Sequence, residues 1–122
     1  NILVGEFNRE PFKCVMHCFS SGEKLARVTT DLGFYLSMSG IITFPKSEYL
    51  RKIFSKIDKN LILLETDSPY LAPVPNRGKK NEPAFTADTA KVGAEIFKLS
   101  EYDFRRLTTE NFYNLFEKVG KP

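Results

Sequence analysis

The sequence has few of the residues that would assign it to a secreted or membrane class. It has no tryptophan, one histidine and two cysteines, Cys14 and Cys18, which lie in one short apolar run. A disulfide framework needs more widely separated cysteines, so we expect reduced thiols and a cytoplasmic location. The longest apolar stretch, residues 61–64, is far shorter than the ~18 residues of a membrane span, and we expect no membrane partner.

The amino terminus also lacks familiar signals. It has no initiator methionine and no basic segment followed by an apolar one, so we expect no secretion signal and a chain that begins within a longer protein. The 122 residues include 42% hydrophobic and 27% charged residues, which is typical of a globular domain and excludes low-complexity disorder. The formal net charge of +3 permits a nucleic-acid partner without indicating one.

A short β-rich run followed by a helical pattern recurs along the first half of the sequence. This alternation is typical of parallel βα units and predicts an α/β fold. The expected strands are 13–18, 34–39 and 61–67, and the expected helices are 23–32, 45–57, 84–99, 100–107 and 109–116. The apolar residues expected to face the core are Leu25, Val28 and Leu32, then Tyr49, Leu50, Ile53, Phe54 and Ile57, then Phe85, Val92, Ile96 and Leu99, and finally Phe104, Leu107, Phe112, Leu115 and Phe116.

About three βα units are roughly half of a (β/α)8 barrel, whose eight units take ~250 residues. We therefore expect residues 1–122 to form a single partial domain. Its strand edges and inner face, including Val15, Tyr35 and Leu63, would then need another part of the barrel, another chain or self-association to cover them.

Strand parity brings three polar side chains to the same face. Side chains alternate along a strand, so Val15 and His17 share one face of the first strand, and Leu63, Glu65 and Asp67 share one face of the third. If the opposite, apolar face meets the covering helices, then His17, Glu65 and Asp67 point into the barrel near the carboxyl ends of their strands. Barrel enzymes place their active sites there.

Each of these residues also has a simpler explanation. His17 could be a hydrogen-bonded core or surface histidine, Asp67 could cap a turn, and Glu65 could neutralise a basic partner inside the barrel. The cysteines are expected to be buried apolar side chains rather than zinc ligands, because a zinc site would need two further ligands.

A loop over residues 68–83 contains four prolines and a basic cluster, Arg77, Lys79 and Lys80, followed by Asn81. It is too long for a routine βα connection of ~2–6 residues. Such a cluster can be simply solvated, but its place after the last strand suits phosphate binding. Ser37 and Ser39 could contribute in the same way or be small residues chosen for packing.

Four segments carry a resemblance to a known family: HCFSSG at 17–22, GFYLSMSGIITF at 33–44, ETDSPYL at 65–71 and PNRGKKNEP at 75–83. In this order they resemble the C-terminal portion of the TatD-type metal-dependent deoxyribonucleases, over about residues 12–116. The resemblance implies the C-terminal half of a TIM barrel of the metal-dependent hydrolase type. It also implies one or two divalent ions, Mg, Mn or Zn, and cleavage of phosphodiester bonds in DNA.

The resemblance also implies roles for individual residues. His17 would be a metal ligand, and Asp67 a metal ligand or the base of the reaction. Arg77, Lys79 and Asn81 would help to hold substrate phosphates, and Glu65 would orient its neighbours.

The family's His-x-His pair, a middle-strand glutamate and a further histidine have no counterpart here, and we expect them before Asn1. The isolated chain should then be inactive, since catalytic metals commonly have three or more protein ligands. Two alternatives are open: a non-enzymatic half-barrel interaction module, and a metal-dependent hydrolase of an amide or lactone.

Overall fold

The computed structural model describes residues 2–122. Its helices are α1 (Ile2–Arg9), α2 (Glu23–Asp31), α3 (Glu48–Phe54), α4 (Thr86–Phe97) and α5 (Glu101–Leu115), and its strands are β1 (Val15–Met16), β2 (Tyr35–Met38) and β3 (Ile62–Leu64). Short 3₁₀ turns lie at Gly40–Thr43, Pro45–Ser47, Lys59–Leu61 and Pro83–Phe85. None of the helices described for residues 2–122 has both the length and the apolar character needed to cross a membrane.

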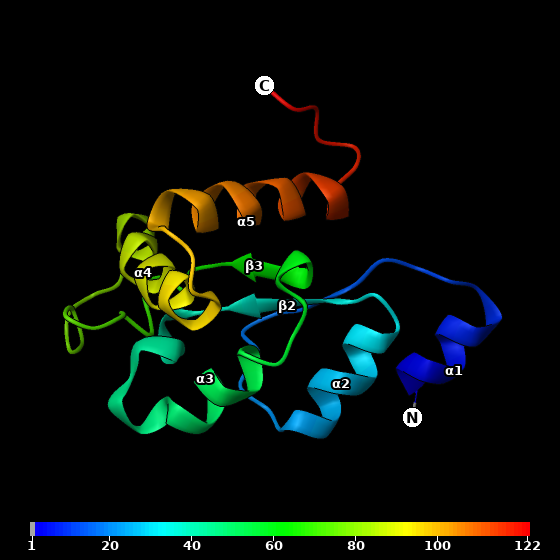
Figure 1. Ribbon diagram of the computed structural model, residues 1–122, viewed down its shortest axis with the longest axis horizontal. Coiled ribbons are helices and arrows are strands. Elements are labelled where there is room, and N and C mark those ends of the chain that lie inside the picture. The colour runs from blue at the N-terminus through cyan, green and yellow to red at the C-terminus, as the bar shows by residue number, and fades with distance from the viewer. Residues whose placement is uncertain (1) are drawn as a thin grey trace.

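The strands form one parallel sheet in the order β1-β2-β3, as the βα alternation predicts. Figure 1 shows β2 and β3 side by side and pointing the same way. Val15 pairs with Tyr35, and Leu36 pairs with Ile62. Parallel pairing brings the carboxyl ends of all three strands to one edge. This edge carries the residues that follow each strand, including His17, Ser39 and Glu65.

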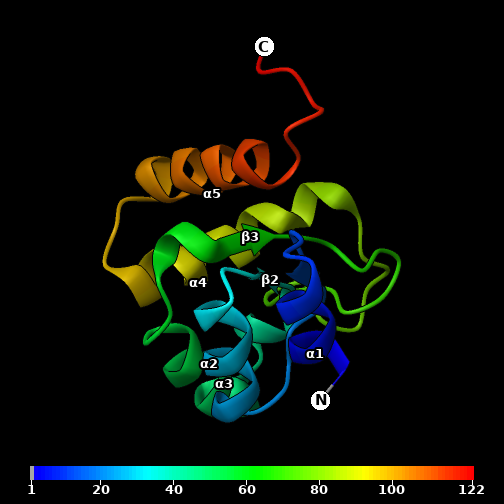
Figure 2. The same cartoon turned by 90° about the vertical axis from the view of Figure 1, so that its right-hand side faces the viewer.

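Helices enclose the sheet on one face and along one edge. In two perpendicular views α2 and α3 lie below the sheet and α5 runs beside β3 (Figures 1 and 2). The core includes the fully buried side chains of Leu36, Met38 and Ile62 from the sheet, and Phe54 and Phe104 from the helices. These strand residues share the parity expected for the helix-covered face.

The strands are shorter than predicted. Residues 17 and 18 form a turn after β1, and the last polar residues of the expected third strand lie beyond β3. Cys18 has a φ of 47°, in the left-handed region that is uncommon outside glycine and incompatible with a continuing strand. The chain thus leaves the ladder where the polar side chains begin.

The predicted apolar stripes of α2, α3 and α4 are partly wrong, and in α3 Tyr49 is 53% exposed. Helix α2 buries Ala26 and Thr29, whereas Leu25 is 37% exposed. Helix α4 buries its small residues, Thr89, Ala90, Gly93 and Ala94, while the larger ones are only half-buried. The reason in α4 is close approach, because a methyl group on Gly93 would lie 2.3 Å from Cε1 of Phe104 in α5.

The carboxyl-terminal region is one helix rather than the two expected. Ser100 caps α5, as predicted, by accepting a hydrogen bond from the Asp103 N–H at 3.0 Å. The expected break near Thr109 is wrong, since residues 101–115 contain neither glycine nor proline to stop the helix. Phe112 and Phe116 are 40% and 42% exposed, so only Leu115 of that predicted trio is buried.

Asn111 fastens α5 to the edge of β3. Its side-chain amide is buried and donates to the carbonyls of Lys59 at 2.9 Å and Ile62 at 2.8 Å.

The inner face of the sheet, expected to be bare, is partly covered. Leu63 is only 6% exposed, and Val15 and Tyr35 are half-buried.

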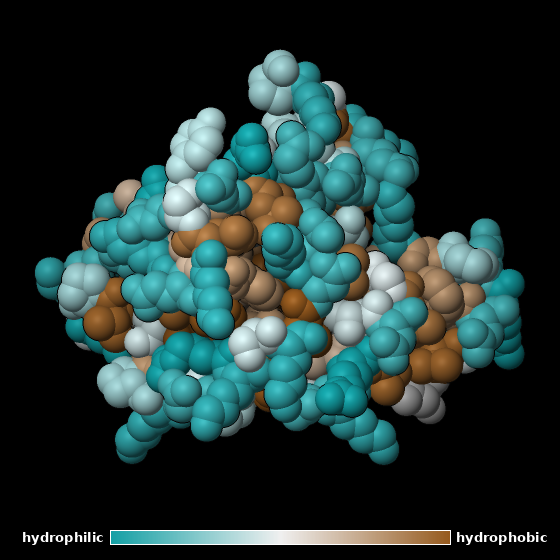
Figure 3. Space-filling view, viewed as in Figure 1, coloured by the Kyte–Doolittle hydropathy of each residue, from teal (hydrophilic) through white to brown (hydrophobic). Residues whose placement is uncertain are grey.

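Helix α1 has no counterpart among the predicted elements. Phe7 of α1 packs edge-on against Phe34 with ring centroids 5.5 Å apart, and Phe12 completes this aromatic cluster. The cluster lies at the amino-terminal end of β2, away from the polar strand ends. Apolar side chains remain visible on the α1 end of the surface (Figure 3), where Ile2 is 83% exposed.

Candidate metal centre

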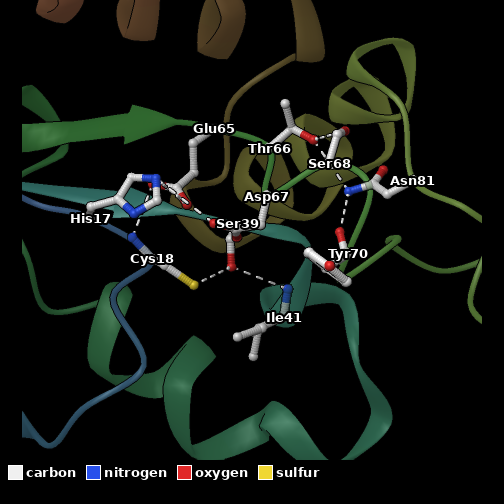
Figure 4. Close-up of polar contacts among 10 residues, drawn as sticks. All are labelled: His17, Cys18, Ser39, Ile41, Glu65, Thr66, Asp67, Ser68, Tyr70 and Asn81. Atoms are coloured by element: carbon white, nitrogen blue, oxygen red, sulfur yellow. Dashed lines mark hydrogen bonds and ion pairs between the residues drawn. The ribbon is translucent and has the colours of Figure 1, made fainter.

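The carboxyl ends of β1 and β3 bring together the polar side chains that parity predicts for one face. His17 follows β1 directly, and Glu65 and Asp67 follow β3. His17 Nε2 lies 3.2 Å from Glu65 Oε1 and 3.8 Å from Asp67 Oδ1. One donor atom from each of the three side chains can be chosen such that all lie within 4.8 Å of one another (Figure 4). This spacing is suitable for donors that share one cation.

The burial of the cluster is uneven. The His17 side chain is 66% exposed, whereas those of Glu65 and Asp67 are only 10% and 18% exposed. Glu65 Oε1 and Asp67 Oδ2 are buried and have no hydrogen-bond partner among residues 2–122. The close approach of His17 to Glu65 therefore lacks the geometry of a hydrogen bond. Buried carboxylate oxygens without a partner are costly.

The donor set fits a divalent metal ion. An imidazole nitrogen with two carboxylate oxygens is suitable for zinc or for manganese, and the carboxylates also suit magnesium. A cation would provide the partner that the two buried oxygens lack. The exposed imidazole closes the cluster on the solvent side, where a substrate could approach.

The turn at residues 17 and 18 sets the position of Glu65. With its left-handed backbone, Cys18 directs its N–H to Glu65 Oε2 at 3.0 Å. Its thiol lies 3.6 Å from the Ser39 hydroxyl, which in turn accepts from the Ile41 N–H. Burial raises the pKa of the Cys18 thiol, a hydrogen bond with Ser39 partly offsets this, and the nearby Asp67 and Glu65 carboxylates raise it further. Cys18 thus supports the cluster as a neutral group.

The structure narrows the simpler explanations. His17 is exposed, which excludes a core histidine and leaves a surface histidine as the simpler alternative. The turn after Asp67 is closed by the Tyr70 N–H donating to the Asp67 backbone carbonyl at 2.8 Å, not to its carboxylate, so the cap explanation is not needed. Glu65, expected only to orient its neighbours, is also a candidate ligand. Parity places it on the correct face, but its distance from His17 comes from the turn at Cys18.

The predicted phosphate-binding residues occupy different environments. Arg77 and Lys79 are exposed, and the Arg77 guanidinium lies over the Phe44 ring, 3.8 Å from its centroid. Asn81 is 5% exposed, and its amide donates to Tyr70 O at 2.7 Å and Thr66 Oγ1 at 3.2 Å. These bonds give Asn81 a structural role in the loop, and its contact with substrate stays a prediction.

The two serines that could have assisted phosphate binding are both buried. The Ser37 carbonyl accepts from the Phe19 N–H at 3.1 Å, and the Ser39 hydroxyl is engaged as described above. Packing and capping therefore account for them.

Comparison with known proteins agrees with this geometry. The family model described as "TatD related DNase" matches residues 2–117. The chain belongs to the TatD-related DNase family. It is 45% identical to the uncharacterized metal-dependent hydrolase YcfH of Escherichia coli K12 over 102 residues. This match covers 84% of this chain and 38% of YcfH. It is also 36% identical over 114 residues to the uncharacterized metal-dependent hydrolase YabD of Bacillus subtilis, a match that covers 93% of this chain and 45% of YabD.

Solved structures of TatD proteins share the fold. The chain is similar to YjjV, a TatD homologue from Escherichia coli K12, with a TM-score of 0.79 and 28% identity over 88% of this chain and 41% of that one. A hydrolase TatD family protein from Entamoeba histolytica matches with a TM-score of 0.78 and 22% identity, over 93% of this chain and 45% of that protein. The three βα units are thus part of a TatD TIM barrel, as predicted. The chain spans about two fifths of the length of the relatives it matches, 38% of YcfH and 41% of YjjV.

Proposed function

We propose that the complete protein carrying this chain is a metal-dependent hydrolase that cleaves phosphodiester bonds in DNA. The observation that carries the proposal is the cluster of His17, Glu65 and Asp67, with two buried oxygens that have no other partner. Membership of the TatD-related DNase family supports phosphodiesters as the substrate. So do the exposed cations Arg77 and Lys79, which lie on the loop that follows Asp67.

In the proposed mechanism the three side chains would hold a divalent cation. His17 would contribute Nε2, and Glu65 and Asp67 would contribute one carboxylate oxygen each. When bound, such a cation would polarise a phosphoryl oxygen and lower the pKa of water. Glu65 keeps its other oxygen on the Cys18 N–H, which fixes the orientation of its carboxylate.

The buried Oδ2 of Asp67 would hold the cation, which leaves Oδ1, 3.8 Å from His17 Nε2, as its second oxygen. We assign it to accept the proton of the attacking water, which is the role of a general base. Arg77 and Lys79 bind backbone phosphate next to the scissile bond, because guanidinium and ammonium groups form strong charge-assisted hydrogen bonds to phosphate.

The test uses the complete protein, freed of metal and titrated with Mg²⁺, Mn²⁺ or Zn²⁺. An Asp67→Asn variant keeps the size of the side chain but loses its charge and basicity. We expect kcat for a DNA oligonucleotide to fall by about 100-fold or more, together with weaker cation binding by calorimetry. Asp31→Asn, at the exposed end of α2, is the matched control and should keep the wild-type rate.

An Arg77→Ala variant should behave differently. It should weaken DNA binding and lower the slope of log affinity against log salt by about 1, with a smaller effect on kcat. Near-wild-type kcat in Asp67→Asn would refute the catalytic assignment. Hydrolysis of an amide or lactone with no cleavage of DNA would replace the proposed substrate class, and absence of any hydrolysis by the complete protein would favour the interaction module.

A further inference from the structure

A cleft of about 280 Å³ borders the loop that follows the metal centre, and the proposed mechanism uses only its cations. Phe44, Pro69 and Tyr70 give it aromatic and apolar walls, and Arg77 and Lys79 add positive charge. Neither cation forms a salt bridge within residues 2–122. A ligand that matches these walls has a flat ring and a negative charge, and a nucleotide has both.

The cation side of the cleft is held in place before any ligand binds. The Arg77 guanidinium lies 3.8 Å from the centroid of the Phe44 ring, a cation–π arrangement that restricts its rotation. The backbone of Phe44 is held in place, because its carbonyl accepts a 2.8 Å hydrogen bond from Arg51 and its N–H donates to Ile41 O at 3.0 Å. The N–H edges of Arg77 are therefore presented to an anion at little further entropic cost.

The ring side of the cleft is Tyr70, which is 73% exposed although it is a large aromatic residue. Its backbone is held at both ends. The Tyr70 N–H donates to Asp67 O at 2.8 Å, and the Tyr70 carbonyl accepts from the buried Asn81 amide at 2.7 Å (Figure 4). An exposed ring on a fixed backbone is a suitable stacking surface for a base.

The same turn places the cleft next to the cluster of carboxylates. The hydrogen bond between Tyr70 and Asp67 closes a four-residue turn, so the two Cα atoms are less than ~7 Å apart. The backbone of Tyr70 is therefore anchored to a residue of the metal centre, and we expect a nucleotide stacked on Tyr70 to belong to the same bound strand.

We propose that this cleft is a nucleotide subsite in which Tyr70 stacks on a nucleobase while Arg77 and Lys79 bind its phosphate. This inference rests on the proposed function, and it adds that recognition depends on the base as well as on the backbone charge. The subsite positions the nucleotide adjacent to the cleaved bond without reading its sequence, because every base has a stacking face.

The experiment measures the affinity of the metal-loaded complete protein for two labelled probes by fluorescence anisotropy. One probe is a cleavage-resistant phosphorothioate oligodeoxynucleotide, and the other has the same backbone with abasic residues throughout. Tyr70→Ala should weaken binding of the first probe by about 5-fold to 150-fold, and should leave binding of the abasic probe unchanged. Tyr70→Phe, which keeps the ring, should bind both probes as the wild type does.

Two controls make the result specific. Tyr102→Ala removes a tyrosine that is equally exposed, 74%, but lies on α5 outside the cleft, and should change neither affinity. Arg77→Ala should weaken both probes by a similar factor, since both carry the phosphate backbone. Equal weakening of both probes by Tyr70→Ala, or no weakening of the base-containing probe, would overturn the subsite, as would absence of binding by the wild type.

The subsite and the proposed function can fail separately. If DNA is cleaved but Tyr70→Ala binds the base-containing probe normally, the subsite is wrong and the proposed function stands. If Tyr70→Ala loses base-dependent binding while the wild type cleaves no DNA, the subsite stands and the proposed reaction is wrong.

Discussion

Substituting Gly40 with alanine should destabilise the protein because this glycine lies against the backbone of the loop after β3. An added methyl group would lie 2.1 Å from the Leu71 carbonyl oxygen and 3.2 Å from the Pro73 nitrogen. Gly40 is not in the left-handed region of φ, so alanine fits its backbone conformation. The steric contact is therefore the sole source of the expected effect.

The size of the effect follows from these contacts. Non-bonded atoms pack at about 3.5 Å or more, so the loop would have to shift by about 1.4 Å to accommodate the methyl group. Extra methyl or methylene groups in a packed region cost about 1–3 kcal/mol. We expect about 3 kcal/mol, at the upper end, because the opposing atoms belong to backbone and are not the flexible end of a side chain. Leu71 follows Tyr70, so affinity for the base-containing probe should fall as well.

The measurement is urea denaturation of wild type and variant, with Gly5→Ala as the matched control. The same methyl group added at Gly5 meets nothing within 4 Å, and alanine favours a helix such as α1 over glycine by about 1 kcal/mol. Gly5→Ala should thus be neutral or stabilising. A loss of less than about 1 kcal/mol in Gly40→Ala would refute the packing argument.

Two further predictions concern the carboxyl-terminal helix and the isolated chain. Asn111→Ala should lower the free energy of unfolding by about 1–3 kcal/mol, because it removes two hydrogen bonds of ~0.5–1.5 kcal/mol each. As a control in the same denaturation assay, Asn114→Ala at an exposed position should change this free energy by less than ~0.5 kcal/mol. The isolated 122-residue chain should show negligible nuclease activity with Mg²⁺, Mn²⁺ or Zn²⁺, and robust metal-dependent turnover would contradict this. The isolated chain should also self-associate in sedimentation experiments, and a compact monomer at high concentration would contradict that.

Local sequence signals predicted the order of helices and strands correctly, whereas some buried helix faces depend on tertiary contacts that the sequence does not show. The β-rich runs and the cap at Ser100 are short-range features, and they gave the parallel sheet and the start of α5 correctly. The buried face of α4 depends on how closely α5 approaches Gly93, which no periodicity in α4 alone can indicate. The continuity of α5 past Thr109 is itself a local feature, because residues 101–115 contain neither glycine nor proline, and the hydrogen bonds of Asn111 to the Lys59 and Ile62 carbonyls add a tertiary contact to it.

Strand parity predicted which side chains of the candidate site share a face, but it did not predict all of their roles. Parity grouped His17 with Glu65 and Asp67 on one face, and the family resemblance gave roles to the first and last of them. The candidacy of Glu65 as a ligand depends on the left-handed turn at Cys18, which the sequence does not reveal because cysteine rarely adopts it. The role of Asn81 depends on contacts with Tyr70, 11 residues away along an irregular loop.

The composition of the cluster itself indicates what it binds. His17 Nε2 is a single atom, and at one time it can serve as a close partner for only one of the two buried carboxylates that face it. A protein that buries Glu65 Oε1 and Asp67 Oδ2 without hydrogen bonds pays a free-energy cost that these three side chains cannot remove by themselves. A divalent cation would remove this cost, because it could accept the nitrogen and one oxygen of each carboxylate as ligands. The unfavourable burial at these strand ends therefore supports the proposal that His17, Glu65 and Asp67 hold a metal ion.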